Sequence, residues 1–338
     1  MIRISVPGKV HLIGEHSVVY GEPAIIGAIS LYSKIKAEKN KKIKIIANNL
    51  KRKETFSLEE ILTFTKELNS LWERGFKKKD FLELHKVMNK DKLNTVKSAI
   101  GKTLEILKIN FGLKLEINSE IPIGSGLGSS ASLSVGIPAA IAKIYEKDLT
   151  KEEINKIAYE IEKFNHGTPS GGDNSTCCFG GLIWFKKGNP NQILSLRKEI
   201  PYELKNFLLV YTEKPKKTTG ELVSLVRNLK PEYREPRIKE LGKLTREMRK
   251  VLKKKDFEKM KKIMNKAQKI LSELGVSTKK IDLIHKKVKE IGGSAKLSGA
   301  GGGGIMICYH ENKEKLENLI KDLGFKYMET ELGVKSIF

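Results

Sequence analysis

The sequence predicts a mixed α/β (α+β) fold arranged in two domains. Three observations support this prediction. The length of 338 residues fits two domains of ordinary size, strand-like and helix-like hydrophobic patterns follow one another along the chain, and the composition changes near residue 195. Because hydrophobic residues make up 39% of the chain, a sizeable core can form. We expect an N-terminal domain over residues 1–195 and a C-terminal domain over residues 196–338.

Strand and helix patterns alternate in the first part of the chain. Three segments alternate apolar and polar side chains and predict strands: residues 1–6, 43–47 and 113–118. Between the second and third of these, mostly helical patterns run from residue 58 to residue 107. A segment rich in glycine and serine follows at 122–132, and small apolar residues then predict a buried helix up to Tyr145.

The start of the next helix is marked by a capping-box pattern. Thr150 and Glu153 form this pattern, and the apolar spacing after them predicts a helix that ends near His166. The remaining expected elements are strands at residues 182–185 and 207–212, Lys-rich helices over residues 219–291, a glycine run at 299–304, a strand at 305–309, and one more helix and strand.

The formal net charge of +24 is a feature shared with nucleic-acid-binding proteins. Here the basic residues are dispersed and dominated by lysine, on helices that also carry glutamate. A nucleic-acid surface more often shows clustered arginine with interleaved aromatic residues, and aromatic residues make up only 7% of this chain. We therefore favour solvated helix faces, together with a positive field that attracts small anionic substrates.

The cysteines and the hydropathy bear on the compartment. Cys177, Cys178 and Cys308 form neither a CxxC pair nor a disulfide framework, which is typical of small buried side chains in a reducing compartment. No stretch of about 18 apolar residues occurs, and no targeting segment is visible. We expect a cytoplasmic protein.

The strongest chemical signal is the glycine- and serine-rich segment 122–132, which lies between a strand and a helix. Glycines let the backbone approach an anion closely, and the free amides at a helix N-terminus bind phosphate. The hydroxyls of Ser129 and Ser130 can cap the helix or hold Mg²⁺. The segment matches neither a Walker A loop nor a dinucleotide-binding fingerprint.

Polar residues in three other motifs are further candidates. Lys9 follows Pro-Gly at the end of the first predicted strand, where it can be held at a site, although a surface lysine is the commoner case. Glu162 lies at the edge of an apolar helix stripe and needs a partner such as a cation. Asp173 lies in a glycine-rich turn, which presents it to a ligand or simply uses it as a turn former. His11 and His16 do not share a helical face, so we expect no metal site there.

The glycine run before the strand at 305–309 is the fourth signal. So many glycines together indicate close approach of the backbone to a ligand or to another loop. The alternative is a flexible linker, but linkers rarely lead straight into an apolar strand.

Four motifs in this order resemble the GHMP kinase superfamily: PGKVHLIGEHSVVYG, PIGSGLGSSAS, HGTPSGGDN and KLSGAGGGG. The resemblance extends from Pro7 to Gly304. Within the superfamily the chain is most similar to the mevalonate kinases, because galactokinases continue differently after a similar GEH and homoserine kinases usually lack it. One departure is Gly172, where the family more often has Val or Ile.

The resemblance implies a fold and an activity. The fold would combine an N-terminal α/β domain that contains a left-handed βαβ unit with a ferredoxin-like C-terminal domain, and the terminal strand would return to the first domain. The activity would be ATP-dependent phosphorylation of mevalonate on its C5 hydroxyl, in the mevalonate route to isoprenoids. ATP would be the co-substrate and Mg²⁺ the cofactor.

The resemblance also assigns catalytic and metal-binding roles. Asp173 would accept the proton of the substrate hydroxyl, and Lys9 would be the cation that assists it. Ser130 and Glu162 would bind Mg²⁺. The resemblance assigns the substrate site in the same way. Glu15 and His16 would line the mevalonate pocket.

Two further assignments concern loops. A threonine in the segment 215–219 approaches the active site in the family, and we assign this role to Thr218. The ATP phosphate loop would consist of Gly124, Ser125, Gly126, Leu127, Gly128, Ser129 and Ser130.

Three rival functions stay open at this point. One is another kinase of the superfamily, such as a phosphomevalonate or homoserine kinase. Another is a catalytically inactive relative that binds ATP without turnover, and the third is nucleic-acid binding. We expect mevalonate and ATP as partners, with neither nucleic acid nor a membrane, and the sequence leaves open whether the chain forms a homodimer.

Overall fold

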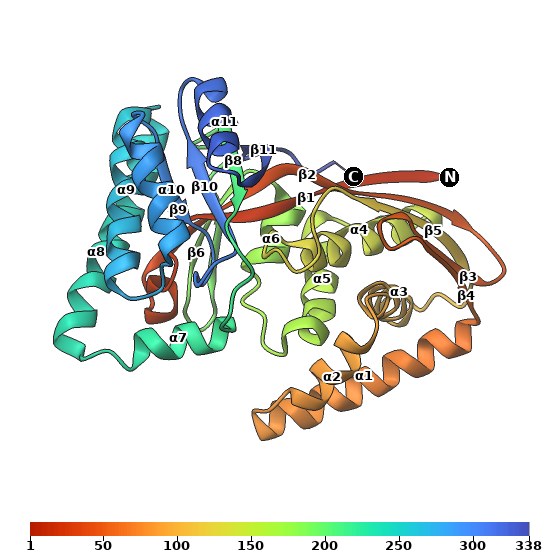
Figure 1. The fold of residues 1–338 in the computed structure, drawn as a ribbon. Helices are drawn as coiled ribbons and strands as arrows, with labels where there is room; N and C mark the ends of the chain where they lie inside the picture. The colour runs from red at the N-terminus through yellow and green to blue at the C-terminus, as the bar shows by residue number, and fades with distance from the viewer. Residues whose placement is uncertain (338) are drawn as a thin grey trace. The chain divides into compact units, whose positions relative to one another are not determined.

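The computed structural model describes residues 1–337 and divides into two compact units (Figure 1). The first unit consists of residues 1–8, residues 31–180 and the segment that begins at Lys335. The second unit consists of residues 9–30 and 181–334. Residue 195, where the composition changes, lies inside the second unit. The division into domains at that residue stays a prediction.

Two long strands contribute residues to both units, namely β1 (Ile2–Ile13) and β2 (Pro23–Lys39). In the first unit, the sheet has the strand order β4-β3-β5-β2. The bounds of its other strands are β3 Ile43–Ala47, β4 Arg52–Phe56 and β5 Leu113–Ser119. Strands β3 and β5 are parallel, so the residues between them include a crossover. The predicted strands are confirmed, and the left hand of this crossover stays a prediction.

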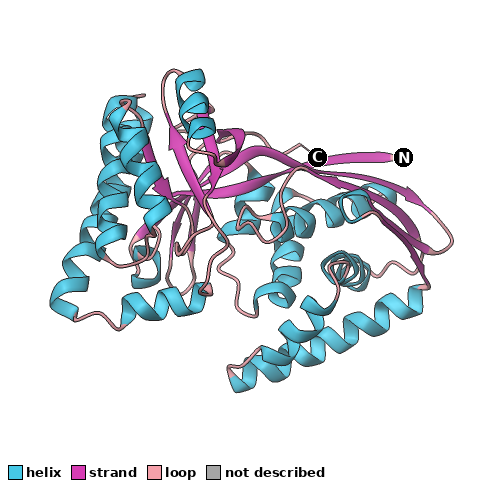
Figure 2. Cartoon of the chain, viewed as in Figure 1, coloured by secondary structure: helices cyan, strands magenta, loops and turns pink. Residues whose placement is uncertain are grey.

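Six α-helices belong to the described part of the first unit, and Figure 2 shows them in cyan beside the magenta strands. Their bounds are α1 Leu58–Lys78, α2 Leu82–Lys90, α3 Asn94–Leu107, α4 Ser129–Ile144, α5 Lys151–His166 and α6 Gly172–Phe179. The predicted capping box of α5 is confirmed. Thr150 Oγ1 accepts from the amide of Glu153, and the Glu153 carboxylate accepts from the amide of Thr150.

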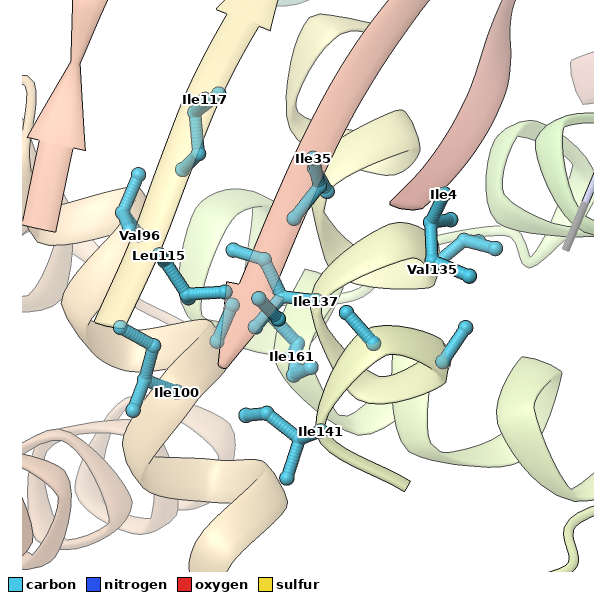
Figure 3. Close-up of a cluster of buried hydrophobic side chains, with 14 of the residues drawn as sticks. Ile4, Ile35, Val96, Ile100, Leu115, Ile117, Val135, Ile137, Ile141 and Ile161 are labelled. Carbon is cyan, nitrogen blue, oxygen red and sulfur yellow. The ribbon is translucent and has the colours of Figure 1, made fainter. Parts of the chain in front are cut away.

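The core of the first unit lies between the sheet and α4 (Figure 3). Ile4, Ile35 and Leu115 project from the strands towards apolar residues of α4 and α5, and all of them are buried. Small residues in α4 leave little space between the helix and the sheet. At Gly136, a Cβ would lie 2.6 Å from Cδ1 of Ile35. The helix therefore packs close to the sheet, and it holds the residues at its N-terminus in a fixed place.

In the second unit, four antiparallel strands of the sheet follow the order β9-β10-β8-β11. Its strands are β8 Leu204–Tyr211, β9 Ser294–Leu297, β10 Ile305–Tyr309 and β11 Lys326–Leu332. The helices are α7 Thr219–Arg227, α8 Pro231–Lys253, α9 Phe257–Glu273 and α10 Lys279–Glu290 between β8 and β9, and α11 Lys313–Asp322 between β10 and β11. This connectivity is ferredoxin-like, as the sequence resemblance implies. A hairpin of β6 (Leu182–Lys186) and β7 (Gln192–Ser195) precedes it and pairs with the start of β2.

The Lys-rich helices of the second unit are amphipathic. They bury apolar residues along one stripe, and most of their lysines are exposed. Lys261 of α9 differs, because it is buried and forms ion pairs with Glu258 and Glu311. The three cysteines are buried, as predicted, and within residues 1–337 none of them forms a disulfide. Over residues 1–337, no helix has both the length and the apolar character that a membrane span requires.

The two ends of the described chain meet in the first unit. The amide of Ser5 donates to the carbonyl of Ile337 at 3.0 Å, and the amide of Ile337 donates back at 3.1 Å. The first unit is therefore closed by residues from opposite ends of the sequence.

Candidate active site

Three alternate glycines shape the loop that precedes α4. Gly124, Gly126 and Gly128 have φ angles of 73°, 76° and 81°, in the left-handed region that glycine adopts without steric cost. At Gly124 and Gly126 a Cβ would meet no atom within 4 Å, so backbone conformation and not packing requires glycine there. Leu127 is buried and anchors the loop.

The N-terminus of α4 has the features of an anion-binding site. Gly128 is the N-cap residue, and no side chain caps the first amides of the helix. The helix begins with the hydrogen bond from the Ser132 amide to the Gly128 carbonyl, at 2.9 Å. The amides of Ser129 and Ser130 therefore remain for an external acceptor, and the helix dipole favours an anion.

The Glu162 carboxylate lies beside this helix and is buried. Its Oε1 atom accepts from the hydroxyl of Ser134 at 2.8 Å and from the amide of Asn165 at 3.1 Å. Its Oε2 atom accepts from the Ser130 hydroxyl at 3.3 Å and lies 3.4 Å from Nε2 of His166. The structure thus brings Ser130 and Glu162 together, and one carboxylate oxygen is fixed while the other faces Ser130.

The pair fits a Mg²⁺ ion. A hydroxyl and a carboxylate are hard oxygen ligands, and Mg²⁺ in phosphate-binding sites uses one or two carboxylates together with phosphate and water. Within residues 1–337 no three His, Cys, Asp or Glu side chains are grouped as a metal site.

Asp173 lies in the first turn of α6, and not in the glycine-rich turn that the sequence suggested. Gly171 forms the turn, with a φ of 82°, and the helix begins at the next residue. A helix N-terminus stabilises the ionised form of an acidic side chain. Asp173 also shares a cavity of about 180 Å³ with seven other residues: Glu162, His166, Thr168, Pro169, Ser170, Gly171 and Asn174.

Lys9 lies within β1 in the second unit. The sequence placed it at the end of the first strand, but the strand continues to Ile13, because Val10 and Leu12 extend the buried apolar pattern. Only 7% of Lys9 is exposed. Its ammonium group is therefore held by its surroundings and is not a surface charge.

Glu15 and His16 form a tight turn in the second unit. The amide of Ser17 donates to the carbonyl of Glu15 at 2.7 Å, and His16 has φ 60° and ψ −44°. These values describe a γ-turn of the rare, strained kind, which clusters at functional sites. Both side chains are buried.

One hydrogen bond defines the tautomer of the neutral His16 ring. Nε2 lies 2.8 Å from the carbonyl oxygen of Ala300, which can only accept, so Nε2 carries the proton. Burial lowers the pKa of His16 below its ordinary value of 6.5, although this hydrogen bond and the charge of Glu15 oppose the shift. Nδ1 is therefore an acceptor.

Sequence reasoning gave no role to Lys296, which forms a buried ion pair with Glu15. Lys296 is fully buried in β9, and its ammonium group also donates to the carbonyl of Leu297 at 2.7 Å. Burial lowers the pKa of Lys296, and the charge of Glu15 opposes this shift. The available signal was a lysine between Ala295 and Leu297 in an apolar strand.

The glycine run at 299–304 packs against another part of the chain. A Cβ at Gly301 would lie 2.2 Å from the carbonyl oxygen of Val276, and one at Gly303 would lie 2.8 Å from the carbonyl oxygen of Glu213. The prediction of close backbone approach is confirmed, and the contact is with neighbouring loops. The flexible-linker alternative is wrong.

Thr218 is the N-cap residue of α7. Its hydroxyl donates to the Glu221 carboxylate at 2.8 Å and accepts from the Glu221 amide at 3.3 Å. The residue is exposed, and its own amide completes a capping box by donating to the Glu221 carboxylate at 2.6 Å. A role in substrate binding stays a prediction.

Two family descriptions match the chain. The GHMP kinases N terminal domain matches residues 94–181, and the GHMP kinases C terminal domain matches residues 248–329. Mevalonate kinase of Methanocaldococcus jannaschii is 37% identical over 329 residues, with 95% of each chain covered. Mevalonate kinase of Pyrococcus furiosus is 34% identical, with 97% of this chain and 95% of the relative covered.

The fold is similar to solved structures as well. The crystal structure of the Methanococcus jannaschii mevalonate kinase has a TM-score of 0.82 to this chain, with 35% sequence identity. The similarity covers 98% of both chains.

Proposed function

The chain belongs to the GHMP kinase family, in the branch of the mevalonate kinases, and we propose that it transfers the γ-phosphoryl group of ATP to the C5 hydroxyl of mevalonate. The product is 5-phosphomevalonate, an intermediate of the mevalonate route to isoprenoids. The single observation that carries the kinase assignment is the Ser130–Glu162 pair at the N-terminus of α4, directly after the three-glycine loop.

The loop from Gly124 to Ser130 binds the phosphates of ATP in this proposal. The amides at the start of α4 donate hydrogen bonds to the phosphate oxygens, and the open space at Gly124 and Gly126 leaves room for them. Ser130 and Glu162 would hold Mg²⁺, and the ion would supply positive charge that offsets the charge of the phosphates.

Asp173 accepts the proton of the attacking hydroxyl. Its place at the N-terminus of α6 favours the ionised form that a general base needs. Lys9 offsets the negative charge that develops on the transferred phosphoryl group. Phosphoryl transfer requires mainly positioning and charge neutralisation, and these residues supply both.

Glu15 and His16 bind mevalonate in the proposal, with Thr218 as a further contact. The two buried side chains offer acceptor atoms, which suit the hydroxyl groups of this substrate. Mevalonate and ATP are small, water-soluble molecules. A cytoplasmic location, with neither nucleic acid nor a membrane as partner, belongs to the same proposal.

A coupled assay of ADP release tests the function. The purified chain is incubated with ATP and Mg²⁺ and with mevalonate, phosphomevalonate, homoserine or galactose. We expect turnover with mevalonate that exceeds turnover with the other three alcohols by orders of magnitude. Turnover with homoserine or galactose, and none with mevalonate, would show that the substrate assignment is wrong.

A further inference from the structure

Two segments of the second unit are joined by side chains that come from distant parts of the sequence. Three contacts join residues 11–16 to residues 296–300: the Ser298 hydroxyl with the main chain of His11, Lys296 with Glu15, and His16 with the carbonyl of Ala300. The strained turn of His16 therefore rests on the segment that begins at Lys296.

The Lys296–Glu15 contact is unusual because both groups are removed from water. Lys296 is fully buried, and the Glu15 side chain is 2% exposed. A buried ion pair is weak evidence for stability, because an apolar pair of similar volume often stabilises a protein equally well or better. Such a pair is better explained by a requirement for defined charge and geometry at that place.

The two oxygens of the Glu15 carboxylate have different surroundings. Lys296 donates to Oε1, whereas Oε2 is buried and has no hydrogen-bond partner among the described residues. Nδ1 of the neighbouring His16 is also buried and has no hydrogen-bond partner among the described residues. A buried acceptor without a partner is costly, so both atoms indicate a ligand that donates hydrogen bonds.

We propose that Lys296 is a positioning residue for substrate binding: it holds Oε1 of Glu15 and so keeps Oε2 available to accept a hydrogen bond from a substrate hydroxyl. The ligand group is a hydroxyl and not the carboxylate of the substrate, because a second anion would repel Glu15 and Nδ1 of His16 cannot donate. This inference rests on the proposed function in taking the substrate to be an alcohol with more than one hydroxyl group.

Loss of the ammonium group should weaken substrate binding selectively. In Lys296→Met the side chain keeps its length and loses its charge, so the buried Glu15 carboxylate has no cation and turns or takes up a proton. We expect KM for mevalonate to rise at least about tenfold, because a hydrogen bond to a charged group is lost. KM for ATP should stay within about twofold of the wild-type value. An unchanged KM for mevalonate would refute the proposal.

A double variant separates positioning from stability. Lys296→Met combined with Glu15→Gln removes both charges, so no unpaired charge remains buried and the melting temperature should recover towards that of the wild type. KM for mevalonate should stay raised, because the carboxylate acceptor is absent. Recovery of both the melting temperature and KM in the double variant would show that the pair is structural only.

Lys261→Met is the matched control. Lys261 is also a buried lysine that pairs with glutamates, but it lies on α9, and its partners Glu258 and Glu311 lie outside the two joined segments. We expect this variant to lose thermal stability with no change in KM for mevalonate. An equal rise in KM in both single variants would mean that any buried lysine has this effect, and the proposal would fail.

A measurement without turnover keeps this inference separate from the proposed function. Spectra of the chain labelled with ¹⁵N-histidine, with His16 assigned by the His16→Gln variant, report the tautomer of its ring. We expect Lys296→Met to change the ¹⁵N shifts of His16 and Lys261→Met to leave them unchanged. If wild type does not phosphorylate mevalonate, the proposed function fails while this result still decides the role of Lys296. Unchanged His16 shifts in Lys296→Met would refute the proposal.

Discussion

The side-chain amide of Asn174 donates to the side-chain oxygen of Asn155 at 2.7 Å, and this hydrogen bond ties the first turn of α6 to α5. Asn155 also donates to the hydroxyl of Ser175 at 3.0 Å. The residue before Asn174 is Asp173, so the two hydrogen bonds fix the backbone that carries the proposed base. The backbone at Asp173 is thus tied to α5, and we expect a change of charge at this side chain to leave the fold intact.

Asp173→Asn tests the proposed base. The substitution keeps the size and removes the charge, so kcat should fall by at least about 10²-fold, the usual scale for loss of a general base. KM for mevalonate should change less, because the loss is felt mainly in the transition state. Single-turnover rates and thermal unfolding, measured on the same sample, check both statements. A folded variant with a near-normal rate would move the catalytic role to another residue.

Glu162→Gln tests the proposed Mg²⁺ site. The amide can still accept from Ser134, so the fold should persist, but a neutral ligand binds Mg²⁺ more weakly than a carboxylate. We expect a higher Mg²⁺ concentration for half-maximal activity and a lower kcat. Glu160→Gln, on the same helix, is the control, because its carboxylate forms an ion pair with Lys163 on the helix surface. Equal Mg²⁺ dependence in the two variants would contradict the site.

Gly126→Ala tests the phosphate loop. A methyl group there enters open space, so the cost to stability is that of the left-handed backbone alone, about 1–2 kcal/mol. We expect KM for ATP to rise well beyond what this cost explains, because the methyl group occupies space meant for phosphate. Gly324→Ala carries the same strain at a φ of 74°, also in open space, and should leave KM for ATP unchanged. Steady-state kinetics and chemical denaturation of both variants decide the outcome.

The fold should become less stable at low pH, because the buried His16 is more easily protonated in the unfolded chain than in the folded one. Because burial lowers its pKa, the unfolded chain binds more protons than the folded chain between the lowered pKa and 6.5. Stability therefore rises with pH across that window and is lost as pH falls below 6.5. Denaturant unfolding at pH 7 and pH 5.5 measures the loss, which should be smaller in His16→Gln. An identical loss in both proteins would show that His16 stays uncharged in the unfolded state or exposed in the folded one.

Local patterns were sufficient to predict much of the fold. The alternation at residues 43–47 gave β3, and the pairing of Thr150 with Glu153 gave the start of α5, because both signals depend only on near neighbours. The ferredoxin-like connectivity was predicted from the resemblance of four ordered motifs to the GHMP kinase superfamily. The glycine loop and its serine were likewise found from sequence, since anion binding at a helix N-terminus has a local signature.

Contacts between distant residues were not predictable in the same way. Lys296 and Glu15 are separated by 281 positions, and no periodicity shows that a lysine in a short apolar strand meets a carboxylate so far away. Asp173 was expected in a turn because glycines precede it, yet the buried side chains from Asn174 to Cys178 pack as a helix. The strand that carries Lys9 was likewise longer than Pro-Gly suggested, because tertiary packing outweighed local preference.

The bridge between Ser5 and Ile337 also sets an order of events during synthesis. A ribosome releases residue 5 long before it reaches residue 337, so part of the first unit stays unpaired until residue 337 has emerged. The second unit is also completed late in synthesis, because Ile29 pairs with Leu332 of strand β11. Assembly of this enzyme is thus dominated by contacts of high sequence separation, which fold slowly, and a nascent chain stalled anywhere before residue 332 would lack the closing strands of both units.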